Sequence, residues 1–261
     1  MLKKFGEKMK KHYKTVFISD LHLGSKTCKS EQLSKFLSDF SCEELYLVGD
    51  IIDGWQLAKG KSFFPQEHVN IIRKILTKAK KGTKIYYVIG NHDDFLRQYS
   101  DIIHIFGNIS ISNEFLYTSI IGKRYLVTHG DLYDAVVLYH EWVAKFGDTL
   151  YNTLVWMNTI FNKIRAKFNL EYWSLSGFLK SKVKGALEFM YAFEDLTTKE
   201  AKKRNLDGII CGHIHNPDRK IVNNIEYWND GDWTESCSAI IEHLDGHMEI
   251  YYFSETEEIV K

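Results

Sequence analysis

Residues 15–24 read TVFISDLHLG, an apolar run with β-branched residues that ends at Asp20, and His22 follows two positions later. Runs of this composition are typical of buried strands. Four more such runs end just before a polar residue: LYLVG before Asp50, IYYVIG before Asn91, YLVT before His129 and GIICG before His213. The sequence therefore predicts five strands whose ends carry polar side chains.

Helix-like segments lie between several of these runs. SEQLSKFLSDF covers residues 30–40, and EHVNIIRKILTKAK covers residues 67–80, with Gly82 as a helix stop. Strands that alternate with helices indicate an α/β protein. The later runs FLYTSI, KRYLVT, KIVNNIEYW and HMEIYYF are typical of a meander, which favours a layered α/β sandwich over a purely parallel sheet.

Residues 132–195 differ from the rest because they show helical periodicity, many aromatic residues and no strand pattern. We expect a helical insert that packs over the site. Its large aromatic side chains fit a helical core better than ligand contacts, although a pocket lined by some of them is the alternative. These aromatic residues are Trp142, Trp156, Phe161 and Trp173.

The first fourteen residues, MLKKFGEKMKKHYK, hold six lysines against one glutamate. Apolar residues recur there at three- and four-residue steps, at Leu2, Phe5, Met9 and Tyr13. A frayed tail is one interpretation of this segment. The other is a basic amphipathic helix that lies on an anionic membrane surface, which would make the protein a peripheral membrane protein.

Composition excludes several classes of protein. Hydrophobic residues make up 44% and charged residues 26% of the 261 residues, which excludes a disordered or collagen-like chain. Lys+Arg and Asp+Glu both number 34, so a generic basic nucleic-acid surface is not expected. No apolar stretch approaches the roughly 18 residues of a membrane-spanning helix. The four cysteines form no CxxC pair and no secretory leader is present, so we expect reduced thiols and a cytoplasmic location.

The five strand ends bring metal-ligating residue types to one surface, because ligands gather outside the carboxyl ends of strands in open α/β sheets. Together they supply two Asp, one Asn and four His: Asp20, His22, Asp50, Asn91, His129, His213 and His215. This mixture of nitrogen and hard oxygen donors suits two adjacent Mn, Fe, Zn or Co ions better than Ca or Mg. Two divalent ions against two carboxylates leave a positive pocket that attracts phosphate, and paired ions clamp the oxygens of an in-line displacement.

The series D-x-H, G-D, G-N-H-D, H-G-D and G-H-x-H, found in this order over residues 15–245, resembles the calcineurin-like metallophosphoesterase superfamily. The resemblance implies an α/β/β/α sandwich of two mixed sheets over residues 15–261. Asp20, His22, Asp50 and His215 would hold one metal ion, most simply Mn²⁺. Asp50, Asn91, His129 and His213 would hold the second, and a bridging hydroxide would be the nucleophile.

The same resemblance implies that His92 is the proton donor or phosphate-binding group, oriented by Asp93 or Asp53. We interpret Asp131 and Asp134 as partners of His129 or turn residues. The remaining histidines lack such neighbours and are interpreted as surface or helix residues: His12, His68, His104, His140, His243 and His247.

A finer resemblance is to the bacterial UDP-2,3-diacylglucosamine pyrophosphatase group, through SDLHLG, LVGDIID, IGNHD, HGD, the helical insert and EYWNDGDW. It implies cleavage of the pyrophosphate bond of a lipid-linked UDP-sugar to a lipid monophosphate and UMP, with the insert as a cap over the acyl chains. The best-known members carry Arg where this chain has His92. Within the insert, four residues are candidate phosphate or nucleotide contacts, with solvated side chains as the alternative: Asn158, Arg165, Lys180 and Lys184.

The same superfamily includes proteins with other functions, three of which are alternatives for this chain. A phosphatase or phosphodiesterase that acts on a soluble phosphoester would keep the metal ligands and differ in the cap. A nonenzymatic trafficking scaffold is disfavoured because every ligand position is filled here. A DNA-repair nuclease is disfavoured by the neutral charge and the length of the chain. The pattern makes no prediction of the oligomeric state.

Overall fold

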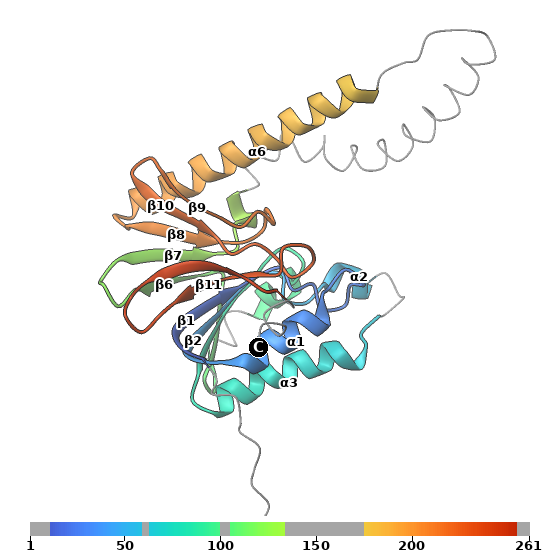
Figure 1. Ribbon diagram of the computed structural model, residues 1–261, viewed down its shortest axis with the longest axis vertical. Coiled ribbons are helices and arrows are strands. Elements are labelled where there is room, and N and C mark those ends of the chain that lie inside the picture. The colour runs from blue at the N-terminus through green and yellow to red at the C-terminus, as the bar shows by residue number, and fades with distance from the viewer. Residues whose placement is uncertain (1–10, 59–62, 100–104, 134–174, 255–261) are drawn as a thin grey trace, which may run out of the picture. The chain divides into compact units, whose positions relative to one another are not determined.

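The computed structural model describes residues 11–58, 63–99, 105–133 and 175–254 (Figure 1). The chain divides into two compact units, one made of Met1–Asp131 with Thr198–Lys261 and the other of Leu132–Thr197. The first unit contains two β-sheets and the helices α1 (Ser30–Asp39), α2 (Gly54–Ala58) and α3 (Gln66–Lys80). In the second unit, the structure describes Leu132 and Tyr133, which belong to a short 3₁₀ turn that begins at Asp131. It also describes the part of helix α6 (Leu175–Lys203) that ends at Thr197.

The larger sheet has seven strands in the order β12-β11-β1-β2-β3-β5-β4. Neighbours pair in parallel from β1 through β2 and β3 to β5, and β11 joins the other edge of β1 in antiparallel register. Val16 therefore lies opposite Leu45 on one side and Ile241 on the other. The strands are β1 (Lys11–Ile18), β2 (Phe40–Val48), β3 (Lys84–Val88), β4 (Ile105–Phe106), β5 (Ile109–Ser112), β11 (Ser238–Glu242) and β12 (Met248–Tyr252).

The smaller sheet has five strands in the order β6-β7-β8-β10-β9. Strands β7, β8 and β10 are parallel, and β6 and β9 pair in antiparallel register at the two edges. The strands are β6 (Glu114–Thr118), β7 (Arg124–Thr128), β8 (Gly208–Cys211), β9 (Asp218–Val222) and β10 (Ile225–Asn229). The predicted sandwich of two mixed sheets is confirmed.

Alternation along the strands separates two hydrophobic cores. In β1, Val16 and Ile18 face the helices, where they join Leu33 of α1 and Ile71 of α3. Phe17 points to the opposite face and joins the core between the two sheets. That second core is aromatic, with side chains from both sheets: Tyr46, Val48, Val88, Tyr117, Tyr125, Val127, Ile210 and Trp228. The period of two in a strand explains how one strand supplies both cores.

The first strand begins before the apolar run that predicted it, within the segment 1–14. β1 begins at Lys11, where it pairs with the start of β2, and residues 1–10 lie outside the described residues. Tyr13 is buried, and its ring centre lies 5.9 Å from that of Phe40. The parallel pairing with β2 extends the strand beyond the apolar run that marked it in the sequence. The helical periodicity that included Tyr13 therefore does not describe residues 11–14.

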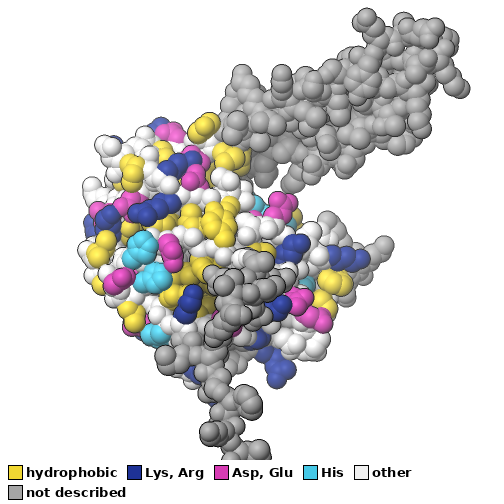
Figure 2. Space-filling view, viewed as in Figure 1, with side chains coloured by type: hydrophobic (Ala, Val, Ile, Leu, Met, Phe, Trp, Pro, Cys, Tyr) yellow, Lys and Arg dark blue, Asp and Glu magenta, His cyan; other side chains and the backbone are white. Residues whose placement is uncertain are grey.

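Two surface properties bear on the expected partners. In the described part of the chain, no helix combines the length and the apolar character needed to cross a membrane. On the face drawn in Figure 2, basic and acidic side chains are interspersed among the described residues. This mixture matches the equal numbers of basic and acidic residues in the sequence.

Candidate metal centre

The predicted ligands come together where strands of both sheets end. Asp20 and His22 follow β1, Asp50 follows β2, Asn91 follows β3, His129 follows β7, and His213 with His215 follow β8. The carboxyl ends of β1, β2 and β3 lie at one edge because these strands are parallel, and the same holds for β7 and β8. This is the position where open α/β sheets bind ligands.

The backbone of this region is strained. Among the described residues, nine non-glycine residues have φ in the left-handed region, and five of them are predicted ligands: Asp20, His22, Asp50, His213 and His215. Each such residue costs about 1–2 kcal/mol relative to ordinary backbone. Backbone hydrogen bonds hold the first turns in place, from Asp20 N–H to Gly49 O at 3.0 Å and from His22 N–H to Asp50 O at 3.0 Å. Strain concentrated on these residues indicates a functional site.

Two glycines allow the strand ends to approach one another. Gly49 has a φ of +87°, and a methyl group there would overlap the ring of His129. A methyl group at Gly90 would overlap the Asp50 carboxylate and lie 2.5 Å from its backbone nitrogen. Only glycine fits this close approach, so the G-D and G-N-H-D motifs have a steric reason for their first residue.

The first group of ligand atoms surrounds Asp20. Its Oδ1 lies 3.0 Å from His215 Nε2 and 3.6 Å from His22 Nε2, and the two imidazole nitrogens are 3.5 Å apart. Asp20 is fully buried, and its Oδ1 has no hydrogen-bond partner among the described residues. A buried carboxylate oxygen left without a hydrogen bond is costly. The donor set therefore fits a divalent transition metal ion.

The second group surrounds His129. Its Nδ1 donates a hydrogen bond to the Val48 carbonyl at 2.8 Å, which leaves Nε2 free to act as a ligand. That Nε2 lies 3.3 Å from Asp50 Oδ2 and 3.3 Å from Asn91 Oδ1. The ring centre of His213 is 5.0 Å from that of His129. Nitrogen and oxygen donors thus converge on a second position.

Asp50 lies between the two groups. Its Oδ1 accepts a hydrogen bond from the backbone N–H of His92 at 2.8 Å, while its Oδ2 faces His129. Ligand atoms of Asp50 also lie within 4.8 Å of those of Asp20, and of those of His22 and His92. This position is the one expected of a carboxylate that two ions share.

The electrostatics of the centre favour ionised carboxylates and positive charge. Burial raises the pKa of Asp20, but the neighbouring imidazoles of His215 and His22 outweigh it and hold the pKa well below its ordinary value. Burial lowers the pKa of His215, but Asp20 outweighs it and raises the pKa to about 9. In the same way, Asp50 overcomes the burial of His129 and raises its pKa well above the usual range. The centre is therefore suited to cations.

His92 is held beside the centre by Asp53 and Trp55. Its Nδ1 donates to Asp53 Oδ1 at 3.0 Å, and its Nε2 lies 3.9 Å from Asp50 Oδ2. The indole of Trp55, 41% exposed, stacks on the imidazole with ring centres 4.1 Å apart. Of the two carboxylates expected to orient His92, the structure brings Asp53 to it.

Asp93, the other carboxylate expected to orient His92, binds the backbone of the loops after β2 and β3 instead. Its carboxylate is fully buried and accepts hydrogen bonds from Gly90 N–H at 2.6 Å, Ile51 N–H at 2.9 Å and Tyr87 O–H at 2.6 Å. These bonds join the loops after β2 and β3. Asp93 therefore positions the backbone that carries Asp50 and Asn91.

Other polar residues around the centre were not recognised in the sequence. Ser19 Oγ lies 2.5 Å from Asp20 Oδ2 and 2.6 Å from Asp230 Oδ1. Ser19 thus links the carboxylate of Asp230 to that of Asp20, the predicted metal ligand. Burial raises the pKa of Asp230 well above its usual value, and the charge of Asp20 adds to this. The acidic run NDGD directly after an apolar run was the available signal for Asp230.

The predicted residues outside the centre differ in whether and where the structure places them. His68, interpreted as a surface or helix residue, is buried on α3, and its Nδ1 accepts a hydrogen bond from Gly24 N–H at 2.9 Å. Asp131 forms an ion pair with Arg97. The remaining candidates lie outside the residues or side chains that the structure describes: Asp134, Asn158 and Arg165, and the side chains of Lys180 and Lys184 on α6.

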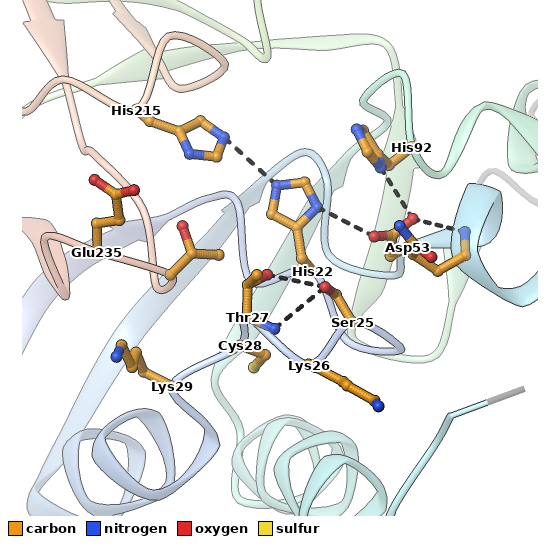
Figure 3. A pocket seen from close by; sticks show the side chains of 12 residues that line it. His22, Ser25, Lys26, Thr27, Cys28, Lys29, Asp53, His92, His215 and Glu235 are labelled. Carbon is orange, nitrogen blue, oxygen red and sulfur yellow. Dashed lines mark hydrogen bonds and ion pairs between the residues drawn. The ribbon is translucent and has the colours of Figure 1, made fainter. Parts of the chain in front are cut away.

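A cavity of about 630 Å³ adjoins the centre (Figure 3). His22, His92 and His215 line one side of it, and the Ser25–Lys29 loop lines another. The cavity gives a group attached to a bound phosphate direct access to the centre.

The sequence of the chain is similar to those of known phosphoesterases. Residues 13–217 match the family model described as calcineurin-like phosphoesterase. The UDP-2,3-diacylglucosamine hydrolase of Neisseria gonorrhoeae is 24% identical over 251 residues, which cover 90% of this chain and 95% of that protein. The protein of the same name from Shewanella loihica is 23% identical over 258 residues, with 93% and 98% covered. Among solved structures, the phosphoesterase Yfce from E. coli has a TM-score of 0.44 and 15% identity, with 92% and 99% covered.

Proposed function

Because the chain belongs to the calcineurin-like phosphoesterase family and is a phosphoester hydrolase, we propose that it cleaves the pyrophosphate bond of UDP-2,3-diacylglucosamine. The products would be the lipid monophosphate and UMP. The observation that carries this proposal is the match, over about nine-tenths of the chain, to relatives named for that substrate. Clusters of His and Asp side chains that could hold metal ions support the proposal.

The metal ligands divide around Asp50. Asp20, His22, Asp50 and His215 would hold one divalent ion, and Asp50 with the ligands that follow β3, β7 and β8 would hold the other. We propose Mn²⁺ for both positions, since nitrogen and carboxylate donors are mixed. Bound ions supply Lewis-acid activation of water and of the phosphoryl oxygens.

His92 is the residue proposed to move a proton. Asp53 holds its Nδ1–H, so Nε2 is the nitrogen that faces the centre. A proton on Nε2 can pass to the oxygen of the leaving phosphate or donate a hydrogen bond to the phosphoryl group. Asp53 and Trp55 act through His92 and are positioning residues.

Other parts of the proposal concern segments beyond the centre. We propose that residues 132–195 select for the acyl chains, with Asn158, Arg165, Lys180 and Lys184 as contacts. The lysine-rich segment 1–14, of which residues 1–10 precede β1, would hold a cytoplasmic protein on the anionic inner membrane surface. The polar cavity beside the centre favours one alternative, a phosphodiesterase or phosphatase that acts on a soluble phosphoester.

Replacing Asp50 tests both the metal centre and the activity. Asp50→Ala removes the carboxylate that both ions share, so we expect turnover to fall by several powers of ten, on the scale of removing metal-assisted catalysis. Metal content, measured by mass spectrometry of the purified protein, should fall from about two ions per chain. Asp245→Ala, in an exposed turn, is the matched control and should change neither quantity.

The substrate is tested with a panel of compounds at defined metal concentrations. UDP-2,3-diacylglucosamine should be cleaved faster than cyclic nucleotides or aryl phosphodiesters, and ¹⁸O from labelled water should identify the phosphorus that is attacked. Preferred cleavage of a soluble ester without detergent would replace the lipid substrate by the soluble alternative. Near-normal turnover in Asp50→Ala would refute the shared-metal centre itself.

A further inference from the structure

The cavity beside the centre has walls of known composition, all within the unit formed by Met1–Asp131 and Thr198–Lys261. Its volume of about 630 Å³ lies in the range of pockets that hold small organic ligands. Because His22, His92 and His215 line it, a ligand in the cavity can extend from a phosphate bound at the metal centre. The cavity is therefore positioned to hold one half of a substrate whose scissile phosphate is bound at that centre.

The chemical character of the lining residues indicates which half of the substrate the cavity would hold. Apart from the buried thiol of Cys28, every lining side chain ends in a polar group. Hydroxyl groups come from Ser25, Thr27 and Thr234. An acyl chain gains free energy by leaving water for apolar surface, and more of the cavity lining is polar than apolar. The cavity fits a hydroxylated, anionic group instead.

The loop that forms one wall is already fixed. Ser25 N–H donates to the His22 carbonyl at 2.9 Å, and Lys29 N–H donates to the Trp233 carbonyl at 2.8 Å. Ser25 Oγ lies 2.9 Å from Thr27 Oγ1 and accepts a hydrogen bond from Thr27 N–H at 3.3 Å (Figure 3). A wall held in this way loses little entropy when a ligand binds.

Lys29 and Glu235 are exposed charged side chains of the cavity, and neither makes an ion pair with another side chain in the described ranges. Lys26, which is also exposed in the lining, lies over the ring of Phe63, 5.8 Å from its centre. A carboxylate accepts hydrogen bonds from the hydroxyls of a ribose, as acidic residues do in dinucleotide sites. An ammonium group donates to base carbonyls. Glu235 and Lys29 thus offer an acceptor and a donor to a nucleoside.

We propose that this cavity binds the nucleoside monophosphate half of the substrate, with Lys29 and Glu235 as the residues that determine specificity for it. The assignment rests on the proposed function, since it divides a UDP-linked lipid into a nucleotide half and an acyl half. The acyl half then lies away from the Ser25–Lys29 loop.

The test compares two phosphate monoesters that differ only in what the phosphate carries. UMP and N-acetylglucosamine 1-phosphate are titrated calorimetrically into the manganese-loaded full chain. Lys29→Met and Glu235→Gln should each raise the dissociation constant of UMP about tenfold, which corresponds to about 1.4 kcal/mol. Both variants should bind the sugar phosphate as the unmodified protein does. Lys35→Met and Glu31→Gln, which replace an ion pair on α1 away from the cavity lining, should leave both affinities unchanged.

The outcomes separate this proposal from the proposed function. Unchanged UMP affinity in both cavity variants would overturn the nucleotide cavity, and so would a loss of affinity for the sugar phosphate alone. Turnover of UDP-2,3-diacylglucosamine is measured on the same preparation. Failure of that turnover while UMP binding depends on Lys29 and Glu235 would refute the lipid substrate and retain a nucleotide-binding hydrolase.

Discussion

At the scale of single residues, the environment of His92 depends on two contacts that have different physical origins. Asp53, which is buried, fixes the ring by a charged hydrogen bond to Nδ1. Trp55 covers one face of the ring by stacking and remains partly exposed. The hydrogen bond sets which nitrogen faces the centre, and the indole limits rotation about the side-chain torsions. Loss of the indole should therefore affect the rate more than the stability.

Trp55→Ala is expected to lower kcat about tenfold and leave KM for a small phosphodiester nearly unchanged. His92→Ala should lower kcat by about 10²–10⁴-fold, the contribution of a general acid, with metal content intact. Trp55→Phe should restore most of the activity because it retains an aromatic face. Steady-state kinetics and metal analysis measure these effects. A Trp55→Ala variant that loses metal, or that Phe does not rescue, would contradict a positioning role.

At the scale of elements, the ends of the strands decide whether the centre forms. Gly49 lies between β2 and Asp50, and Gly82 lies between α3 and β3. Both have positive φ, at +87° and +101°, but a methyl group at Gly82 meets nothing within 4 Å. The two glycines thus share a backbone cost and differ only in their surroundings. Substitutions at the two glycines therefore distinguish the cost of a positive φ from the cost of steric overlap with the side chain of His129.

Gly82→Ala should destabilise the fold by about 1–2 kcal/mol through its backbone alone. Gly49→Ala should lower the free energy of unfolding by about 1–3 kcal/mol more than Gly82→Ala does, as at other overpacked sites, because the new methyl group displaces His129. Urea unfolding measures both changes. Metal content should fall in Gly49→Ala and stay unchanged in Gly82→Ala. Equal metal content in the two variants would show that the loop adapts without moving His129.

How far the sequence predicted these elements depends on where each interaction arises. The apolar runs before Asp20, Asp50 and Asn91 predicted the strands and their ends, because alternation and a polar stop are local properties. The start of β1 at Lys11 was missed, since pairing with β2 is not local. The choice between Asp53 and Asp93 as the partner of His92 required the fold, because Asp93 is adjacent in the sequence whereas Asp53, whose carboxylate reaches the ring, is 39 residues away. Asp230 was missed because it reaches Asp20 through Ser19, over two hundred residues away in the chain.

At the scale of the whole molecule, all four cysteines are buried free thiols, and three of them, Cys28, Cys42 and Cys237, lie in the core between the large sheet and the helices. Burial raises the pKa of Cys28 to about 12, and the neighbouring Cys237 adds to this. Burial likewise raises the pKa of Cys42 to about 12. The folded pKa values exceed the ordinary value of 9.0, so the thiols stabilise the fold below pH 9. That contribution is lost as the pH rises from about 9 towards 12, because only the unfolded chain then releases these protons.

We expect the free energy of unfolding to fall by about 3 kcal/mol between pH 8 and pH 10 from these two thiols. Urea unfolding at each pH measures the slope. The double variant Cys28→Ala with Cys42→Ala should have a smaller slope, whatever its absolute stability. A thiol reagent at pH 8 should modify almost no cysteine in the native protein and four after unfolding. Rapid modification of the native protein would contradict the burial of the thiols.

The order of the strands along the chain also governs when the centre can exist during synthesis. Asp20 and Asp50 leave the ribosome early, but His213 and His215 follow β8, and β11 and β12 complete the large sheet only after them. A nascent chain that ends before residue 208 has neither of the predicted ligands His213 and His215, nor the strands that flank β1 and β7 on one side. With His213 and His215 as proposed ligands, we expect hydrolytic competence to arise only late in translation, and we expect prematurely terminated chains to be inert rather than poorly selective.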